Sequence, residues 1–390
     1  MTEKDDPTPD RFQRSDPPLA GEGKKICAPL VLVAAGGTGG HLFPAEALAA
    51  ALARRNIPVA LATDSRAAKF GGAFAAERVH IIPSATWRGR DPLSVARTGG
   101  TLAYGLAKAF LLYGHLKPSI VVGFGGYPTV PPVMAAALRK IPTLIHEQNG
   151  VMGRANKFLS SRVTAIATGF AGVTDGDPKL AAKTTCTGNP VRPAVVTAAA
   201  TLFETPAPGG VFHLLVFGGS QGARVMADIV PEAVARLEPH LLMRLKIVQQ
   251  AREEDLPRVR DAYARAKVQA FVSPFFPDLP ARMAASHLVI SRSGASTVAE
   301  LAAIGRPSIL VPLPHALDQD QNANAKVLEK AGGAIRLPQT EFTPDRLAAE
   351  IACLAGDPER LTRMAKGAKS EGVLDAADQL AELVIRTAGS

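Results

Sequence analysis

The feature that most constrains this fold is an apolar run that ends in a cluster of glycines near the start of the chain. The run covers residues 30–35, the glycines fall within 36–40, and His41 and an alanine-rich helical pattern follow, with Pro44 in its first turn. This order predicts a buried strand, a tight loop and a helix. Glycines let backbone N–H groups turn toward a ligand and the helix N-terminus adds its dipole, so the loop is suited to bind a phosphate.

Three other interpretations of this loop are open. A P-loop would have Lys followed by Ser or Thr after the glycines, and the chain has His41 in place of the lysine. A dinucleotide-binding loop would need a small residue where Leu42 stands, although Asp64 lies about where a ribose-binding carboxylate would be expected. The loop could also be a tight turn that binds nothing. The choice among these interpretations depends on motifs in the rest of the chain.

Composition narrows the class of partner. The 390-residue chain has 44 Lys and Arg against 35 Asp and Glu, a net charge of +9, which favours a phosphorylated substrate or an acidic membrane surface. Aromatic residues make up only 5% and no long basic cluster occurs, so we expect no nucleic-acid partner. Because no run of about 18 apolar residues occurs, the sequence predicts no membrane-spanning helix.

Cysteine and carboxylate spacing predict neither a metal site nor a cofactor. Cys27, Cys186 and Cys353 are far apart and lack metal-ligand spacing, so we expect free thiols in a reducing compartment. Two Asp-x-Asp matches, 175–177 and 318–320, fall in a glycine-proline turn and at a helix start, and we interpret both as chance. Residues 1–25 are polar and lack the apolar region of a signal peptide, so we expect a disordered tail.

The pattern of strand, loop and helix recurs along the chain. It returns at 119–128, 142–150, 211–224 and 288–301, which predicts two α/β domains, each a doubly wound Rossmann-like fold, facing each other across a cleft. Ligands of such sheets bind at the carboxyl ends of the strands, so His41, Tyr127 and residues 147–149 should line one cleft. Short buried strands are also expected at 58–63 and 79–82, with a helix between them.

A change of pattern marks the domain boundary. We predict a first domain over 26–190, a linker rich in Pro, Ala and Thr over 191–208, and a second domain over 209–372. A last helix within 373–390 is expected to pack back on the first domain.

The segment 92–116 predicts a helix with two sets of apolar residues. The set that should face inward recurs at helical spacing: Leu102, Leu106, Phe110 and Tyr113. The second set lies off this stripe, beside Lys108 and Lys117: Tyr104, Leu111, Leu112 and His115. These residues are either scattered over the surface or form a patch that meets an anionic membrane surface.

Residues 288–301 favour a nucleotide site. A strand leads into Ser293–Thr297, whose hydroxyl and N–H groups open a helix, and Glu300 follows one turn later. The helix N-terminus could hold a phosphate, and the carboxylate could accept hydrogen bonds from ribose hydroxyls. The alternative is an ordinary N-cap with an acidic first turn.

Several motifs follow one another in the order found in one enzyme family. They are residues 36–41 (GGTGGH), 125–127 (GGY), 146–150 (HEQNG), 188–192 (GNPVR), 218–223 (GGSQGA) and 292–300 (RSGASTVAE). From about residue 29 to the C-terminal helices, the chain resembles the MurG family of peptidoglycan N-acetylglucosaminyltransferases, in glycosyltransferase family 28, which have the two-domain GT-B fold. The resemblance implies that UDP-N-acetylglucosamine binds mainly to the second domain.

The resemblance also implies the site residues. Donor-binding residues would be Thr38, Gly39, Gly40, Asn149, Arg192, Ser220, Phe276 (through its backbone), Ala295, Ser296, Thr297, Val298, Ala299, Glu300 (on the ribose) and Gln321 (on the sugar). Acceptor-binding residues would be Gly37, Gly125, Gly126 and Tyr127. His41 is the first candidate for the catalytic base and Glu147 the second, although a histidine here could instead donate a hydrogen bond to a phosphate.

The implied reaction moves N-acetylglucosamine to the 4-hydroxyl of undecaprenyl-diphospho-N-acetylmuramyl-pentapeptide, with inversion at the anomeric carbon. This step converts lipid I to lipid II in peptidoglycan biosynthesis. The enzyme would be a peripheral protein on the cytoplasmic face of the bacterial inner membrane, with the anionic membrane surface and cell-wall synthesis proteins as partners.

Two alternative functions stay open. A non-hydrolysing UDP-N-acetylglucosamine epimerase would not need the patch on 92–116. A non-catalytic UDP-sugar-binding membrane protein is the other alternative, against which the joint presence of His41, Glu147 and Glu300 argues.

Overall fold

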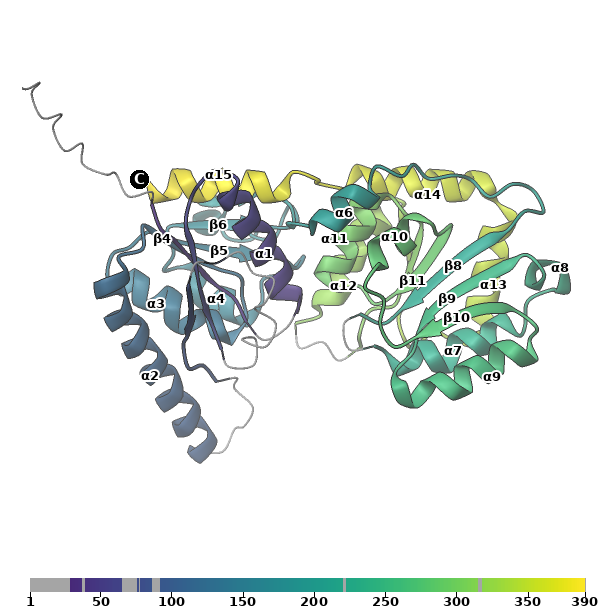
Figure 1. The fold of residues 1–390 in the computed structure, drawn as a ribbon, viewed down its shortest axis with the longest axis horizontal. Helices are drawn as coiled ribbons and strands as arrows, with labels where there is room; N and C mark the ends of the chain where they lie inside the picture. Colours follow the sequence, from purple (N-terminus) through teal and green to yellow (C-terminus); the bar gives the residue numbers. More distant parts are fainter. Residues whose placement is uncertain are drawn as a thin grey trace, which may run out of the picture.

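The computed structural model describes residues 29–36, 39–64, 76, 78–85, 92–219, 222–314 and 318–389. It contains two α/β domains, each built on a parallel sheet, which lie side by side in Figure 1. The predicted pair of doubly wound domains is therefore confirmed. Several predictions fall outside the described residues: the tail 1–25, the helix expected between the strands at 58–63 and 79–82, Cys27, Gly37, Thr38 and Ser220.

The first domain has a seven-stranded parallel sheet in the order β3-β2-β1-β4-β5-β6-β7. Its strands are β1 (Val31–Ala34), β2 (Val59–Thr63), β3 (Arg78–Ile81), β4 (Ile120–Gly123), β5 (Thr143–Glu147), β6 (Ala165–Thr168) and β7 (Thr184–Cys186). Because β1 pairs with both β2 and β4, the strand order reverses at β1, which is where the ligand crevice of an open parallel sheet forms.

Helices cover both faces of this sheet. They are α1 (Gly39–Ala53), α2 (Pro92–Leu116), α3 (Val130–Leu138), α4 (Arg154–Ser160) and the short α5 (Pro178–Ala181), with a 3₁₀ turn η2 (Tyr127–Thr129) before α3. The side chains of α1 pack on one face, and those of α2, α3 and α4 pack on the other. The loop that leads into α1 therefore opens at the strand switch point.

The second domain has a six-stranded parallel sheet in the order β10-β9-β8-β11-β12-β13. Its strands are β8 (Phe212–Phe217), β9 (Leu245–Gln250), β10 (Gln269–Ser273), β11 (Leu288–Ser291), β12 (Ser308–Leu310) and β13 (Ala334–Arg336). Its helical segments are α7 (Arg224–Val234), α8 (Pro239–Leu242), η3 (Glu253–Asp255), α9 (Leu256–Arg265), α10 (Leu279–Ala284), α11 (Ala295–Ile304), α12 (Asp320–Lys330), α13 (Pro344–Gly356) and α14 (Pro358–Ser370). Here too the order reverses at the first strand, β8, which pairs with β9 and β11.

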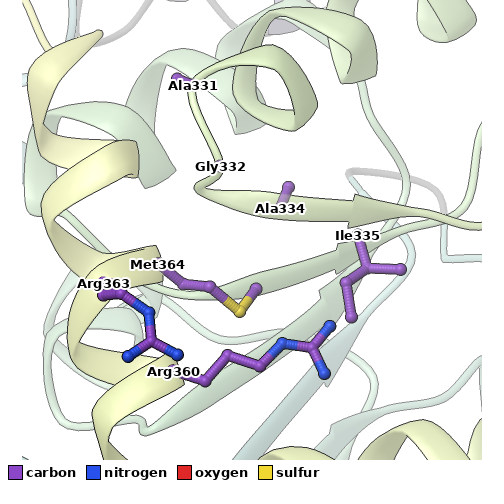
Figure 2. Close-up of a pocket in the computed structure, with 7 residues that line it drawn as sticks. All are labelled: Ala331, Gly332, Ala334, Ile335, Arg360, Arg363 and Met364. Carbon is purple, nitrogen blue, oxygen red and sulfur yellow. The ribbon is translucent and has the colours of Figure 1, made fainter.

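A cavity of about 490 Å³ opens at the outer edge of the second sheet, between α14 and β13 (Figure 2). Arg360 and Arg363 reach it from α14, and Ile335 lines it from β13. Arg363 already lies 3.7 Å from the Glu359 carboxylate, an exposed pair of the kind that contributes little to stability. No residue of this cavity lines the larger cleft between the domains, so we do not assign the site to it.

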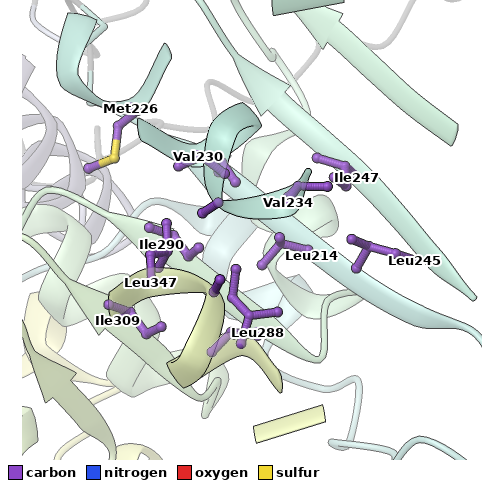
Figure 3. Close-up of a cluster of buried hydrophobic side chains, with 14 of the residues drawn as sticks. Leu214, Met226, Val230, Val234, Leu245, Ile247, Leu288, Ile290, Ile309 and Leu347 are labelled. Carbon is purple, nitrogen blue, oxygen red and sulfur yellow. The ribbon is translucent and has the colours of Figure 1, made fainter. Parts of the chain in front are cut away.

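The core of the second domain shows why its central strands are apolar at nearly every position. Along β8, Leu214 and Val216 pack on one side of the sheet with α7 and α13, whereas Leu215 and Phe217 pack on the other with α11. Figure 3 shows Leu214 in the first of these clusters, near Val230 and Val234 of α7. Successive strand residues point to opposite faces, and helices cover both, so both faces are apolar.

Two local predictions in the first domain are wrong. Residues 79–82 were expected to form a buried strand, but β3 is the outer strand of the sheet, and Val79 and Ile81 are 48% and 47% exposed. Phe110 was expected to face inward and is 38% exposed, because the buried line of α2 runs through Gly105, Ala109 and Tyr113 instead. At position 105 a Cβ would come within 2.1 Å of the Pro83 carbonyl oxygen, so only glycine allows α2 to pack this closely.

Part of the segment assigned to a linker, 191–208, folds with the second domain. It contains α6 (Pro193–Ala198), and Val191, Val195 and Ala198 are buried against α10 and α11. Three small apolar residues in a Pro- and Ala-rich stretch are a weak periodic signal, which is why the sequence favoured a linker here.

The chain crosses between the domains a second time after α14. Helix α15 (Ala376–Ala388) lies against α1 along the top of the first domain in Figure 1, with Leu380 and Val384 buried there. The two crossings meet, because a Cβ at Gly188 would lie 2.7 Å from the Cβ of Val373. The relative placement of the domains is therefore set by two chain segments in contact.

Candidate active site

A cleft of about 970 Å³ lies between the two domains. The predicted site residues that line it come from both walls: Gly40, His41, Asn149, Arg192, Phe276, Ala295, Ser296, Thr297, Glu300 and Gln321. Of the other predicted residues whose burial the structure describes, six are not among its lining residues: Gly125, Gly126, Tyr127, Glu147, Val298 and Ala299. The structure thus brings together loops that are more than 250 positions apart in the sequence, such as those carrying His41 and Glu300.

His41 stands in the first turn of α1 with its imidazole against a glycine pair. Gly125 and Gly126 have φ values of +81° and +72°, and a Cβ at either position would come within 3.4 Å of a ring atom of His41. A side chain at either position would therefore strain the backbone and crowd the ring. The predicted acceptor residues Gly125 and Gly126 form the surface behind the imidazole, and Nδ1 of His41 lies 3.1 Å from Oε1 of Gln148.

Glu147 turns away from the cleft into its own loop. Its Oε1 accepts hydrogen bonds from the N–H and the Nδ2 of Asn149, both at 3.0 Å. Its Oε2 accepts from the N–H of Gly153 at 2.9 Å and from Nδ2 of Asn156 at 2.8 Å. The carboxylate is 2% exposed and already has these donors, so its observed contacts hold the loop 147–153 and the start of α4 in place.

A buried amide joins this loop to the second domain. Asn324, on α12, accepts a hydrogen bond from the N–H of Gly150 at 2.7 Å. Its Nδ2 donates to Oδ1 of Asn149 and to the carbonyl oxygen of Ser293, each at 3.1 Å. Sequence reasoning missed Asn324, although an asparagine on the apolar stripe of a helix, beside Ala325 and Leu328, is a usable signal.

The N-terminus of α11 opens into the cleft. Gly294 is its N-cap and supplies no side-chain hydrogen bond, and the first turn, Ala295 to Thr297, lines the cleft with N–H groups that have no partner within the helix. Oγ of Ser296 is buried and, within the described part of the chain, lacks a hydrogen-bond partner. Val298 differs from its neighbours because its side chain is fully buried in the core. This helix end can accept an anion.

Glu300 lies one turn into α11 and is paired with Arg192, which lies where the chain first crosses between the domains. Nε and Nη2 of Arg192 donate to Oε1 of Glu300 at 3.1 and 2.8 Å. Burial raises the pKa of Glu300, and the Arg192 guanidinium opposes the rise. The Arg192 guanidinium also stacks over the ring of Phe43, 4.8 Å from its centroid, so one arginine contacts both walls of the cleft.

The remaining predicted donor residues lie on loops of the second domain. Phe276 is 6% exposed, and the guanidinium of Arg282 lies 4.8 Å from its ring centroid. Oε1 of Gln321 accepts a hydrogen bond from the N–H of Leu313 at 3.1 Å, which orients this amide at the start of α12. Arg292, which sequence reasoning gave no role, also lines the cleft, and its Nη2 donates to Gln339 at 2.6 Å.

One carboxylate of each Asp-x-Asp match has a structural partner. Asp177 caps α5 by accepting from the N–H of Lys179 at 2.9 Å, and Asp318 pairs with Arg154 at 3.2 Å. Among the described residues, no group of three or more His, Cys, Asp or Glu side chains could hold a metal ion. Cys186 and Cys353 are exposed free cysteines.

Two doubly wound domains that face each other across a cleft define the class of GT-B proteins. Family models agree: the glycosyltransferase family 28 N-terminal domain matches residues 31–168, and the glycosyltransferase family 28 C-terminal domain matches residues 213–380. The chain belongs to glycosyltransferase family 28 and is a glycosyltransferase.

Curated relatives cover nearly the whole chain. One from Rhodopseudomonas palustris (strain BisA53) is 62% identical over 362 residues, 93% of this chain and 97% of the relative. One from Bradyrhizobium diazoefficiens is 60% identical over 362 residues, 93% of this chain and 99% of the relative. Both are named UDP-N-acetylglucosamine–N-acetylmuramyl-(pentapeptide) pyrophosphoryl-undecaprenol N-acetylglucosamine transferase.

Solved structures share the fold. MurG of Acinetobacter baumannii has a TM-score of 0.76 at 28% identity, over 92% of this chain and 99% of that one. A UDP-GlcNAc 2-epimerase of Neisseria meningitidis, solved with UDP-GlcNAc, has a TM-score of 0.65 at 14% identity, over 92% of this chain and 100% of that one. The epimerase likeness extends to the fold alone.

Proposed function

We propose that the protein transfers N-acetylglucosamine from UDP-N-acetylglucosamine to the 4-hydroxyl of undecaprenyl-diphospho-N-acetylmuramyl-pentapeptide, the step from lipid I to lipid II. The observation that carries the proposal is that His41 and Glu300 line opposite walls of one cleft, in a chain 60–62% identical to relatives named for this transfer. An epimerase is favoured by the fold only, and a protein that merely binds the donor would not require an imidazole held against the cleft wall.

The donor binds to the second domain in this proposal. Its diphosphate lies at the start of α11, where unpaired N–H groups and the helix dipole stabilise negative charge. Glu300 accepts hydrogen bonds from the ribose hydroxyls, and Gln321 contacts the sugar. Gly40, Asn149 and the backbone at Phe276 are further proposed contacts, as are Thr38, Gly39 and Ser220.

His41 is the proposed base. It removes the proton of the acceptor hydroxyl as the oxygen attacks the anomeric carbon on the face opposite UDP, so the new C–O bond forms as the bond to UDP breaks and the configuration inverts. The negative charge on the departing UDP is stabilised by the α11 N-terminus and the Arg192 guanidinium, without a metal ion. Glu147 is disfavoured as a base, because its two oxygens already accept hydrogen bonds within its loop.

The proposed membrane contact is an exposed patch on α2 and the end of α3. Tyr104 and Leu111 are 63% and 70% exposed, and the Arg139 guanidinium stacks over Phe110 at 4.5 Å. Lys108 adds charge, whereas Leu112 is partly buried against the core and contributes less than expected from the sequence. Apolar side chains beside basic ones suit the anionic surface of a bilayer.

This patch supports a peripheral location on the cytoplasmic face of the bacterial inner membrane. Within the described ranges, no helix is both long enough and apolar enough to span a membrane. Cell-wall synthesis proteins remain proposed partners, and no nucleic-acid partner is proposed.

One assay tests the function. The purified protein is incubated with UDP-N-acetylglucosamine, and release of UDP is measured with and without the lipid-linked muramyl-pentapeptide. We expect UDP release only with the acceptor, together with a disaccharide-bearing lipid. Isomerisation of the nucleotide sugar without an acceptor would establish an epimerase instead, and donor binding without either reaction would refute catalysis.

A further inference from the structure

Behind His41, a chain of hydrogen bonds leads into the core of the first domain. Nδ1 of His41 lies 3.1 Å from Oε1 of Gln148, and Nε2 of Gln148 lies 3.1 Å from Nδ1 of His146. Nε2 of His146 in turn lies 3.1 Å from the carbonyl oxygen of Gly188. His146 is fully buried, and Gln148 is 2% exposed. The sequence singled out these residues as a motif, and the proposed reaction leaves Gln148 and His146 without a role.

The direction of each hydrogen bond follows from the far end of the chain. The carbonyl of Gly188 can only accept, so Nε2 of His146 carries the proton. Burial lowers the pKa of His146 to about 4, which keeps the ring neutral and makes its Nδ1 an acceptor. The ring of Phe124 stacks on the His146 ring, with centroids 5.5 Å apart, and limits its rotation.

Because its amide group is fixed in one orientation by His146, Gln148 also determines which nitrogen of His41 carries the proton. Its amide nitrogen faces two acceptors, Nδ1 and the carbonyl oxygen of His146, at 3.1 and 3.0 Å. This fixes the orientation of the amide, because the opposite orientation would place two oxygen atoms against each other. Oε1 of Gln148 therefore points to His41 and can accept only from an Nδ1–H group.

We propose that Gln148 and His146 are positioning residues that hold His41 as the Nδ1–H tautomer, so that the Nε2 lone pair is free to take the proton of the acceptor hydroxyl. The inference rests on the proposed role of His41 as the base. It assigns a function to the two residues of the HEQN motif that flank Glu147: they determine which nitrogen of His41 is basic, while Glu147 holds the loop. A base presented through the wrong nitrogen would be inactive in an otherwise intact site.

Two substitutions at one position separate positioning from mere packing. Gln148→Met keeps the size of the side chain but removes the acceptor, so we expect kcat to fall about 100-fold, a loss typical of a misplaced catalytic group, with the KM for UDP-N-acetylglucosamine within about twofold. Gln148→Glu keeps an acceptor for Nδ1–H, and as the uncharged carboxylic acid its O–H can replace the amide donor to Nδ1 of His146. We expect this variant to keep more of kcat than Gln148→Met, and to lose it at high pH, where the carboxyl ionises and one of its oxygens faces the two acceptors of His146.

The charged and titratable groups on the surrounding elements stay constant in these variants. They are Glu46 on α1, Asp64 after β2, His146 and Glu147 on β5, and Arg192 before α6. Gln269, exposed on β10, supplies the matched controls Gln269→Met and Gln269→Glu, which should leave kcat and the pH profile unchanged. Equal losses of kcat in both Gln148 variants at every pH would overturn the proposal.

The tautomer can also be read directly in the unmodified protein. In the full chain labelled with ¹⁵N-histidine, two-bond ¹H–¹⁵N correlations at pH 8 should show His41 protonated at Nδ1, and Gln148→Met should give a mixture of tautomers. An Nε2–H signal for His41 in the wild type would overturn the proposal, even if no variant folds. A tautomer that changes in Gln148→Met without loss of kcat would instead refute the role of His41 as base and leave the hydrogen-bond geometry standing.

Discussion

Donor binding is expected to be strongest with an ionised Glu300, whereas the stability of the ligand-free protein favours a neutral side chain at this position. Its side chain is 7% exposed, and one of its oxygens accepts both hydrogen bonds from Arg192. Because burial raises the pKa of Glu300 more than Arg192 lowers it, the ionised carboxylate is less favourable in the ligand-free protein than in water. We expect Glu300→Ala and Glu300→Gln to separate the two effects.

The expected loss of affinity follows from the proposed ribose contact. Glu300→Ala removes a charge-assisted hydrogen bond worth about 1.5–3 kcal/mol, so the Kd for UDP should rise about 10–150-fold. Glu300→Gln keeps a neutral oxygen acceptor in the same place. It should lose only the extra strength of the charged bond, about 1 kcal/mol, or about fivefold in Kd.

Glu300→Gln is expected to weaken donor binding but to stabilise the folded, ligand-free protein. A carboxyl whose pKa is raised above its ordinary value of 4.5 stabilises the folded protein fully at low pH and loses that contribution as the pH rises through the folded-state pKa. At pH 8 the neutral amide should therefore make the ligand-free protein more stable by about 0.5–2 kcal/mol. This advantage should shrink as the pH falls, because wild-type Glu300 takes up its proton through its raised pKa.

Calorimetry and thermal unfolding check both parts. UDP and 2′,3′-dideoxy-UDP are titrated into each variant, and Tm is recorded at pH 8 and pH 5. Glu359→Gln, at a 92% exposed side chain on α14, is the control and should match the wild type. A Glu300→Ala protein that still prefers UDP over the dideoxy analogue by the wild-type factor would refute the ribose contact. A Gln variant whose relative stability falls between pH 5 and pH 8 would refute the electrostatic reasoning.

Three further predictions concern the base, the metal and the membrane. His41→Ala should lower kcat by about 10²–10⁴-fold with little change in donor Kd, whereas a raised acceptor KM with intact kcat at saturation would mean that His41 only binds phosphate. EDTA should leave most activity, and complete loss that a divalent cation restores would show that the Asp-x-Asp matches had been dismissed in error. Lys108→Ala and Leu111→Ser should each weaken binding to anionic vesicles, by about 1 kcal/mol for the lysine. Binding of the wild type should also weaken with salt, because the Debye length falls from about 10 Å at 0.1 M to about 3 Å at 1 M. Met243→Ser, at an even more exposed apolar side chain in the second domain, should change nothing. If the wild type does not bind such vesicles at low salt, the patch is an ordinary surface.

Local sequence patterns were sufficient to predict the fold and many of the residues that line the cleft. The glycines after β1 and β8 mark the carboxyl ends of the two first strands. The same edges of the two parallel sheets carry the start of α1, with His41, and the start of α11, with Glu300, and both residues line one crevice. The positive φ of Gly125 and Gly126 agrees with their place in a motif, but only the structure shows that His41 needs the space a side chain would fill.

The sequence failed where burial depends on a distant neighbour. The apolar alternation of residues 79–82 does not reveal that β3 lies at the edge of the sheet. The helical spacing of Phe110 does not reveal that the buried line of α2 runs through Gly105, Ala109 and Tyr113. The sequence shows Glu147 only as a carboxylate at the end of a strand, where it is the second candidate for the base. Its donors, from Asn149, Gly153 and Asn156, are visible only once the loop is folded.

Asn324 shows why contacts between the domains matter for the chemistry. Its side chain is fully buried and binds Asn149 and Gly150 on the loop of the first domain and the carbonyl of Ser293 before α11. That loop carries Gln148, and α11 carries the proposed diphosphate and ribose contacts. An amide that no motif contains thus helps to set the position of His41 relative to the donor. A site built this way is sensitive to domain placement at the scale of a hydrogen bond, so residues outside the cleft surface help to set the distance over which the sugar is transferred.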